Sequence, residues 1–337
     1  MSVFSLGTDP EFFVLDTDRR PVPAFKFFPG KEEKRQVAPD YSSRVLAFRD
    51  GYAVEINIPP ASCRENLTLS MLQGLKGTLK CLPMGYTLSS LPAVPIRLPE
   101  DLDGAPEDVR TFGCDPSWNA YTGDCLTVPL DASEHPWRYA GGHMHLSIPT
   151  GYKGYTGFDA YQWIFNAESI MLFVRMLDLY LGVPLTLWFA KEETFRRREY
   201  YGKAGEFRFQ EYMKAPATGL PAYVGVEYRT PGPEVWNAPP VASFAFGVMR
   251  SVAENFDYLR SKWDAGMEEA IRHAVNTGEG ARALLRDSAF CNVEMFEKLV
   301  LRNRPFQTLN TDFKASSEIA QRGWAHYSSV GAEFSLF

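Results

Sequence analysis

The chain has 337 residues, of which 45% are hydrophobic and 23% charged, values that are ordinary for a water-soluble globular enzyme. Its formal net charge of −6 argues against a generic nucleic-acid-binding protein, whose phosphate contacts need a basic surface, so no direct nucleic-acid binding is expected. The five cysteines include no C-x-x-C pair and the N-terminus shows no leader segment, which favours a cytoplasmic protein with reduced thiols.

The first part of the chain predicts two strands, one helix and long irregular segments. In chain order these are a strand over residues 4–15, a loop over 19–40, a strand over 52–58, a helix over 62–79, and irregular chain over 91–110 and 112–124. Pro10 lies inside the first strand and requires an edge or bulge there, because proline has no N–H to donate. Asp50 and Gly51 are a hairpin turn signal before the second strand.

The rest of the chain predicts three further strands and then helices. In chain order these are a strand over 140–147, a helix over 163–181, an arginine-rich segment over 191–201, strands around Phe207 and Val226, and a mostly helical part from about 239 with helices over 265–275, 278–286 and 293–303. The apolar stretch 163–189 contains Glu168, Arg175 and Asp178, which favours a core helix over a membrane span. The three arginines at 196–198 suit a solvated face, but their place just before the next strand suggests that one of them reaches a phosphate.

Two of the five histidines lie two residues apart in the segment AGGHMHLS, residues 140–147. Side chains at positions i and i+2 of a strand point to the same face, so His143 and His145 are expected to lie side by side. The Gly-Gly pair before them allows another group to approach the backbone closely. Taken alone, this pattern also fits an ordinary polar strand face.

Four other strand-like segments, GTDPEFFVL, YAVEINI, GKAGEFRFQ and VGVEYRT, repeat this spacing of polar side chains. If all five strands form one antiparallel sheet, one face carries the polar groups and the other needs a layer of helices. The expected polar face contains Asp9, Glu11, Glu55, His143, His145, Glu206, Arg208, Glu227 and Arg229. The alternative is a half-solvated sheet, but such faces mix in Lys, Ser and Thr, and none of these occupies a paired position.

Carboxylate, imidazole and guanidinium groups together bind divalent metals and phosphates. Because no cysteine cluster accompanies them, Mg²⁺ or Mn²⁺ is expected rather than structural zinc. The sequence contains neither a P-loop nor a G-x-G-x-x-G fingerprint, so a nucleotide would have to lie on the sheet itself.

In this order, the motifs GTDPEF, VEIN, GGHMHLS, GKAGEFR and GVEYR resemble those of the phage-type carboxylate–amine ligases, or type 2 amidoligases. These belong to the glutamine synthetase-like superfamily, with the glutamate–cysteine ligases and guanidino kinases. The motifs run over residues 7–232. The resemblance implies an α+β fold in which a curved antiparallel sheet with a concave active-site face is backed by helices. It also implies a single ligase domain over 1–337, with ATP and two or more divalent ions on the concave face.

The resemblance also assigns roles to individual residues. The implied metal ligands are Asp9, Glu11, Glu55, His143 and Glu227. The implied nucleotide contacts are His145, Ser147, Lys203, Arg208 and Arg229. The implied catalytic residues near the γ-phosphate are Glu206, Arg208 and Arg229. Asp9 stands where glutamine synthetase more commonly has Glu.

The implied reaction is ATP-dependent amide formation through an acyl phosphate, with small-molecule or peptide carboxylates and amines as substrates. Two alternatives remain: a guanidino-type phosphotransferase on the same fold, and a non-catalytic nucleotide-binding relative. A cytoplasmic location is expected, in the host cell if the chain is phage-encoded.

Overall fold

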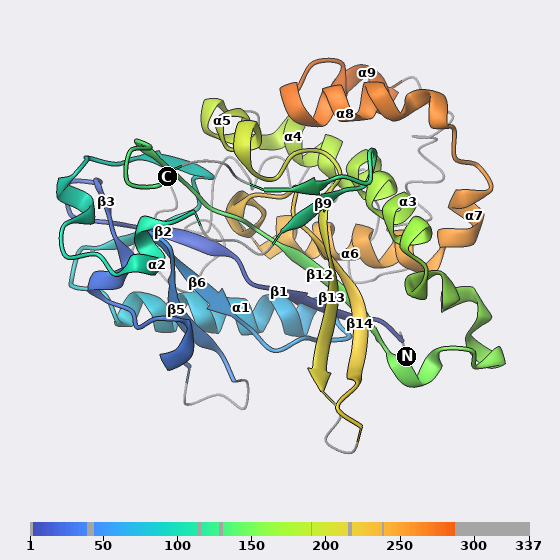
Figure 1. The fold of residues 1–337 in the computed structure, drawn as a ribbon, viewed down its shortest axis with the longest axis horizontal. Coiled ribbons are helices and arrows are strands. Elements are labelled where there is room, and N and C mark those ends of the chain that lie inside the picture. The colour runs from blue at the N-terminus through green and yellow to red at the C-terminus, as the bar shows by residue number, and fades with distance from the viewer. Residues whose placement is uncertain are drawn as a thin grey trace.

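A computed structural model describes residues 3–38, 44–112, 116–127, 131–189, 191–214, 218–237 and 239–286. In these segments the fold is α+β, with curled antiparallel sheets and a layer of helices (Figure 1). The helix predicted over 293–303 lies outside the described residues, as do Cys114 and Cys291.

The first sheet has the strand order β1-β12-β14-β13-β9-β10, and all of its neighbouring strands are antiparallel. Its strands are β1 (Ser5–Thr8), β9 (Ser117–Asn119), β10 (Cys125–Leu126), β12 (Met144–Pro149), β13 (Glu206–Lys214) and β14 (Pro221–Tyr228). The long β13–β14 hairpin projects beyond the rest of the sheet (Figure 1).

The second sheet has the order β3-β2-β6-β5-β4, and β7 also pairs with β2. Its strands are β2 (Glu11–Leu15), β3 (Pro21–Val22), β4 (Arg35–Gln36), β5 (Leu46–Asp50), β6 (Ala53–Asn57) and β7 (Thr87–Ser89). A separate two-stranded sheet pairs β8 (Ala93–Pro95) with β11 (Trp137–Tyr139). The segments expected as loops over 19–40 and 91–124 therefore contain short strands.

The expectation of one strand over 4–15 and of one common sheet is wrong, because the chain changes sheets at Asp9 and Pro10. β1 pairs with β12 in the first sheet, whereas β2 pairs with β6 in the second. Pro10 has no N–H for a ladder, and its carbonyl accepts from the Ile56 N–H at 3.0 Å. Asp9 therefore lies where the two sheets meet.

Alternation along the central strands separates a core face from a polar face. Met144, Leu146 and Ile148 of β12 are fully buried in the core, together with Val226 of β14. The intervening residues point the other way. The register sets His145 opposite Glu227 and Glu227 opposite Arg208, so one polar row crosses three strands.

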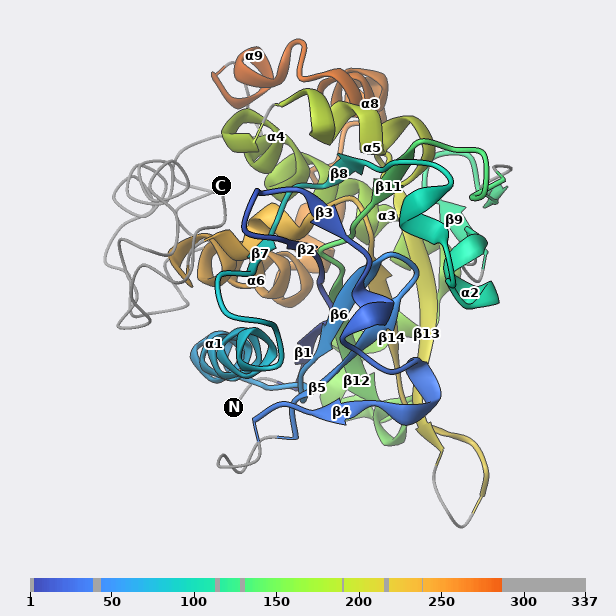
Figure 2. The same ribbon diagram turned by 90° about the vertical axis from the view of Figure 1, so that its left-hand side faces the viewer.

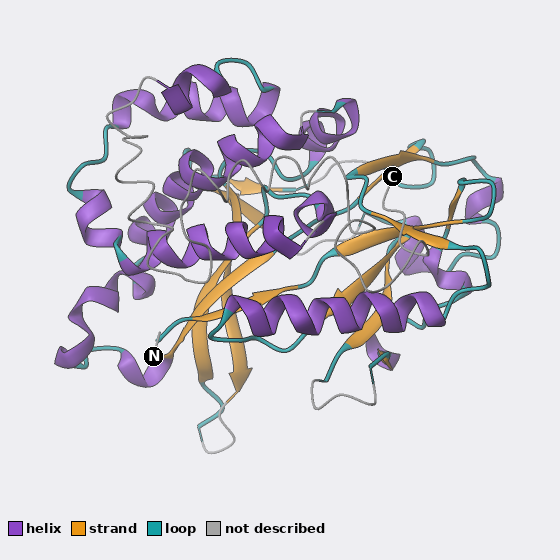
Figure 3. Ribbon diagram, turned by 180° about the vertical axis from the view of Figure 1, so that it is seen from behind, coloured by secondary structure: helices purple, strands orange, loops and turns teal. Residues whose placement is uncertain are grey.

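Helices cover the core face, as Figure 3 shows from behind. The helices are α1 (Arg64–Lys80), α2 (Glu107–Arg110), α3 (Ala167–Leu177), α4 (Val183–Phe189), α5 (Glu192–Tyr200), α6 (Pro239–Glu254), α7 (Phe256–Arg260), α8 (Glu268–Thr277) and α9 (Ala281–Arg286). Figure 2 shows α1 and α6 stacked on one side of the sheets, where α1 packs on β6 and α6 on β12. Every described element from Pro239 to Arg286 is a helix.

The apolar segment predicted as a core helix lies inside the protein. One stretch, Ala167–Phe189, is long and apolar enough to cross a membrane by composition alone, but 78% of its most apolar window is buried. The helix does not end before Gly182 as predicted. A π turn over Asp178–Gly182 joins α3 to α4, so the helical path continues past Gly182 and Pro184 lies within it.

Candidate active site

Glu227 is the centre of the polar row on the first sheet. It is buried, and its Oε1 atom lies 3.4 Å from His143 Nδ1 and 3.6 Å from an Arg208 nitrogen. Arg229 and Gln210 also donate hydrogen bonds to this carboxylate. Burial opposes its ionisation, but His143, Arg229 and His145 together lower the pKa of Glu227 to about 2. Glu227 is therefore a fixed anion surrounded by donors.

Asp9 joins the two predicted histidines. Its Oδ1 atom lies 2.9 Å from His145 Nε2 and 3.4 Å from His143 Nδ1. Burial opposes ionisation here too, but His145 and His143 lower the pKa of Asp9 well below its usual value. The remaining ring nitrogens meet tyrosines: His145 Nδ1 hydrogen-bonds with the Tyr212 hydroxyl at 2.7 Å, and His143 Nε2 with the Tyr201 hydroxyl. The spacing that predicts a shared face for the histidines is confirmed.

A second group of carboxylates, Glu11, Asp50 and Glu55, lies on the second sheet. Glu11 and Glu55 are directly opposite each other on β2 and β6, and both are buried. Each of the three residues offers an oxygen, and these oxygens all lie within 4.8 Å of one another. Burial and the neighbouring Asp50 raise the pKa of Glu11 to about 8, and burial and Asp9 raise that of Glu55 well above its usual value. We call these three residues the acidic cluster.

The acidic cluster has the chemistry of a site for a hard divalent cation. All its donors are carboxylate oxygens, which Mg²⁺ and Mn²⁺ prefer. The pKa values of Glu11 and Glu55 are raised even though Arg229 lies near enough to Glu11, and Lys31 to Glu55, to lower them in part, so a bound cation would relieve the remaining repulsion. The donor set therefore fits the metal that the sequence predicts.

The five metal ligands predicted from the sequence divide between two neighbouring groups. Glu11 and Glu55 belong to the acidic cluster, whereas Asp9, His143 and Glu227 form the ion-pair network on the first sheet. Within the part of the chain that the structure describes, only the acidic cluster brings three ligand atoms this close together. Sequence reasoning missed Asp50, which it used only as a turn signal. The hairpin register was the available clue, because Asp50 pairs with Ala53 and so shares a face with Glu55.

Glu206 and Arg229, two of the predicted catalytic residues, form a buried ion pair, with Arg229 Nε 3.3 Å from Glu206 Oε1. The Ser117 hydroxyl donates to the same oxygen at 2.9 Å, and the backbone N–H groups of Gly202 and Lys203 donate to the other at 2.6 and 3.3 Å. Both oxygens of Glu206 are thus engaged in fixing Arg229 and the turn before β13. Lys203 lies on this turn, and its predicted nucleotide contact stays a prediction.

The three arginines of the run are held by protein groups, and the phosphate contact suggested by their sequence position stays a prediction. Arg197 donates to the carbonyl oxygens of residues 229, 230 and 231 at 2.9, 3.0 and 3.2 Å. Arg198 donates to Thr186 Oγ1 at 2.8 Å, and Arg196 pairs with Glu192 at 2.6 Å. All three are therefore engaged by protein groups, and Arg197 fixes the backbone that carries Arg229.

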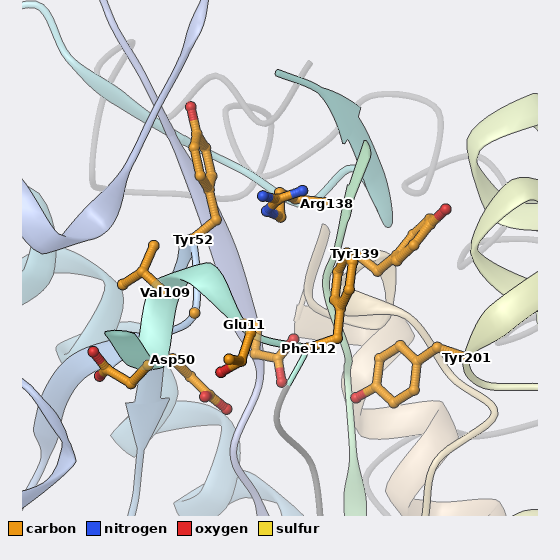
Figure 4. A pocket seen from close by; sticks show the side chains of 11 residues that line it. Glu11, Asp50, Tyr52, Val109, Phe112, Arg138, Tyr139 and Tyr201 are labelled. Carbon is orange, nitrogen blue, oxygen red and sulfur yellow. The ribbon is translucent and has the colours of Figure 1, made fainter. Parts of the chain in front are cut away.

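Two cavities border these polar groups. The larger, about 400 Å³, is lined by Asp9, Asn57, His145 and Ser147 together with residues of the β13–β14 hairpin. The smaller, about 90 Å³, has Glu11, Asp50 and Tyr201 in its wall (Figure 4). We call the smaller one the aromatic cavity and the larger one, after the role proposed for it below, the nucleotide-side cavity. Asp9 and Asn57 are each two residues from a buried glutamate of the acidic cluster, so that cluster adjoins both cavities.

Comparison with known proteins identifies the family. No curated protein matches the chain. The model of one family, described as phage phiEco32-like COOH.NH2 ligase-type 2, matches residues 132–300. This range holds the polar row and Arg229, while the acidic cluster precedes it. The match covers half of the chain and confirms the resemblance inferred from the motifs. The chain belongs to the phage phiEco32-like COOH.NH2 ligase-type 2 family.

Proposed function

We propose that the protein is an ATP-dependent, ADP-forming ligase that joins a carboxylate to an amine through an acyl phosphate. Membership of a carboxylate–amine ligase family supports the reaction class. One observation supports the site above all: a row of His145, Glu227 and Arg208 crosses the sheet beside an acidic cluster that adjoins two cavities. Two cavities suit a reaction that brings a nucleotide together with an acceptor.

The nucleotide-side cavity is the proposed ATP site. His145 and Ser147, both expected to contact the nucleotide, line it, and its size suits a ligand far larger than water. Tyr212 and Tyr223 add aromatic surface against which a base can pack. In this arrangement the phosphates point toward Arg208 and Arg229, and Lys203 lies on the turn that Glu206 holds.

Glu11, Asp50 and Glu55 are the proposed holders of a divalent ion, with Asp9, His143 and Glu227 beside them for a second. Such ions supply charge neutralisation for the triphosphate. The protein itself contributes fixed positive charge. Arg229 is buried and held by two carboxylates, so its guanidinium is oriented before the substrate arrives and stabilises charge on the transferring phosphoryl group.

Glu206 and Arg197 are proposed as positioning residues rather than groups that touch the substrate. Glu206 holds the guanidinium of Arg229, and Arg197 holds the backbone on either side of it. This suits acyl phosphate chemistry, which needs the phosphoryl-binding groups rigid and water excluded from the reacting carbon. We further propose that residues 1–337 form a single ligase domain acting in the cytoplasm, the host's if the chain is phage-encoded.

The experiment is a product analysis of the purified protein with Mg-ATP and defined pools of carboxylates and amines. We expect ADP and phosphate in equal amounts, with a new mass equal to carboxylate plus amine minus water. AMP and pyrophosphate would contradict the acyl-phosphate route. A stable phosphorylated acceptor without an amide would favour the phosphotransferase, and Mg-ATP binding without any turnover would favour the non-catalytic nucleotide-binding relative. Arg208→Gln should lose turnover, while Arg250→Gln, remote from the site, should keep it.

A further inference from the structure

The aromatic cavity has a wall that the reaction described above does not use. Phe112, Tyr139 and Tyr201 line one side of it and Tyr52 the other, as Figure 4 shows. Its volume of about 90 Å³ is several times the roughly 10–15 Å³ that holds one water, so it suits a molecule of a few non-hydrogen atoms. The cavity is contiguous with the active site, because the Tyr201 hydroxyl bonds His143 and its ring lies 4.9 Å from the Arg229 guanidinium.

Arg138 is the unusual residue of this wall. It is only 4% exposed, yet it lies in no ion pair with a carboxylate of the described residues. Its terminal nitrogens donate to the carbonyl oxygens of Ala132, His135 and Trp137, and its shielded Nε has no hydrogen-bond partner among the described residues. Burial lowers the pKa of Arg138 to about 10, which leaves it charged at neutral pH. A buried guanidinium that lines a cavity and pairs with no carboxylate of the described residues is suited to an anionic ligand.

The opposite end of the cavity is acidic. Figure 4 shows the carboxylates of Glu11 and Asp50 below and the Arg138 guanidinium above, with the aromatic rings to the sides. Asp108 also lines the cavity, but it is paired with Arg49 at 3.1 Å. A ligand whose carboxylate meets Arg138 has its other end directed at the acidic cluster, where the proposed reaction takes place.

We propose that the aromatic cavity binds the amine substrate, and that this substrate is a free amino acid whose carboxylate is held by Arg138. This inference rests on the proposed ligase function. The carboxylate held by Arg138 lies at the end away from the acidic cluster, so it is not the group that is activated. The amino group lies beside Glu11 and Asp50, where the acyl phosphate is formed.

The proposed reaction of the amine with the acyl phosphate is an ordinary acyl transfer. The lone pair of the uncharged amine forms a C–N bond to the acyl carbon, and the bond from that carbon to the phosphate oxygen breaks. Phosphate leaves with the electron pair, and the nitrogen releases a proton. The product is a peptide-like amide that ends in the free carboxylate bound by Arg138.

The test measures binding of ligand pairs to the full-length protein in the presence of Mg-ADP, by calorimetry. Each of the common amino acids is compared with its amide, which keeps the amino group and loses only the carboxylate charge. We expect at least one amino acid to bind about tenfold or more tightly than its amide, the loss typical of a charge-assisted hydrogen bond. Equal affinity of acid and amide, or no binding by any amino acid, would overturn the proposal.

Two variants separate this site from general effects on folding. In Arg138→Lys the planar fork is lost, so the preference for acid over amide should fall toward unity while the amide still binds. Arg175→Lys, whose arginine pairs with Glu268 far from the cavity, should keep the wild-type preference. An Arg138→Lys protein that melts like wild type and keeps the full preference contradicts the proposal. Because the wild-type comparison needs no variant, the test stands even if Arg138→Lys folds poorly.

The proposal and the ligase function fail in different ways. If the ligase function is wrong, Mg-ATP turnover to ADP and an amide is absent with every substrate pool. If only the present inference is wrong, ADP and an amide form with amines that lack a carboxylate as readily as with amino acids.

Discussion

Glu55→Gln should make the metal-free protein more stable while removing its response to Mg²⁺. Glu55 is buried opposite Glu11, with oxygens of the acidic cluster within 4.8 Å of one another. At that separation and an effective dielectric constant of about 20, two unit charges repel by roughly 3 kcal/mol. Glutamine keeps the shape and removes the charge. Part of the repulsion is already relieved by protonation, so we expect a gain of about 1–3 kcal/mol.

The raised pKa of Glu11 determines at which pH the gain in stability from Glu55→Gln appears. The pKa of Glu11 is raised from 4.5 to about 8 in the folded protein, mainly by burial and by Asp50. Between these pH values Glu11 is protonated in the folded state and ionised in the unfolded chain. The stability that protonated Glu11 contributes is therefore complete below pH 4.5 and is lost as the pH rises to about 8. The gain from Glu55→Gln should therefore be largest near pH 8.5 and small at pH 5.

The assay is a thermal melt at both pH values, with and without Mg²⁺. At pH 8.5 the variant should melt higher than wild type without metal, by about 2 °C per kcal/mol for a chain of this size. Saturating Mg²⁺ at a hundred times its dissociation constant should stabilise wild type by about 2.7 kcal/mol and the variant far less. Glu211→Gln, on an exposed part of β13, is the matched control and should change neither value. A Glu55→Gln protein that melts lower without metal and keeps the full Mg²⁺ shift would refute this account of the acidic cluster.

Three further predictions concern other parts of the site. Arg229→Lys should lower turnover by roughly two orders of magnitude, because the guanidinium fork that spans two carboxylates is lost. The same change should lower the free energy of unfolding in urea by about 2–4 kcal/mol, since one buried carboxylate loses its partner. Wild-type turnover in a stable variant would contradict this. Ser147→Leu should weaken Mg-ATP binding tenfold or more in calorimetry, because the side chain enters the nucleotide-side cavity, while amino-acid binding persists; unchanged ATP affinity would place the nucleotide elsewhere. Burial raises the pKa of Asp178 to about 6, so the stability that its protonated form contributes is lost as the pH rises through that value. Asp178→Asn should therefore reduce the change in unfolding free energy between pH 4 and 7 by up to about 3 kcal/mol. An unchanged pH dependence in denaturant titrations would count against this.

Alternation was sufficient to predict the polar face of the first sheet. His145, Glu227 and Arg208 lie on three different strands, yet each is flanked by apolar residues with a period of two. That period fixes the face on which each side chain lies, whatever the order of the strands. Alternation leaves the pairing of the strands open, and the resemblance to the ligase family implied only that the sheet is antiparallel.

The relation between the two sheets was not predictable in the same way. Period-two alternation does not reveal that the chain leaves one sheet at Pro10 and enters another, since both halves of residues 4–15 look like strands. The register of the β5–β6 hairpin places Asp50 in the acidic cluster. Carbonyl oxygens of the preceding loop hold Arg138 in the wall of the aromatic cavity. These placements depend on backbone far from the residue in question, which local patterns do not encode.

The Gly-Gly pair of the histidine motif explains how the two sheets act as one site. A Cβ atom at Gly141 would overlap the His143 ring and the Tyr201 hydroxyl, and one at Gly142 would overlap the backbone carbonyl of Gly232. The Gly141 N–H donates to Glu11 Oε2 at 2.7 Å, and its carbonyl accepts the Glu11 N–H at 2.9 Å. One glycine thus holds Glu11 of the second sheet against the segment that leads through His143 into β12. The motif needs glycine because the acidic cluster and the polar row approach each other across this backbone, which leaves no room for a side chain.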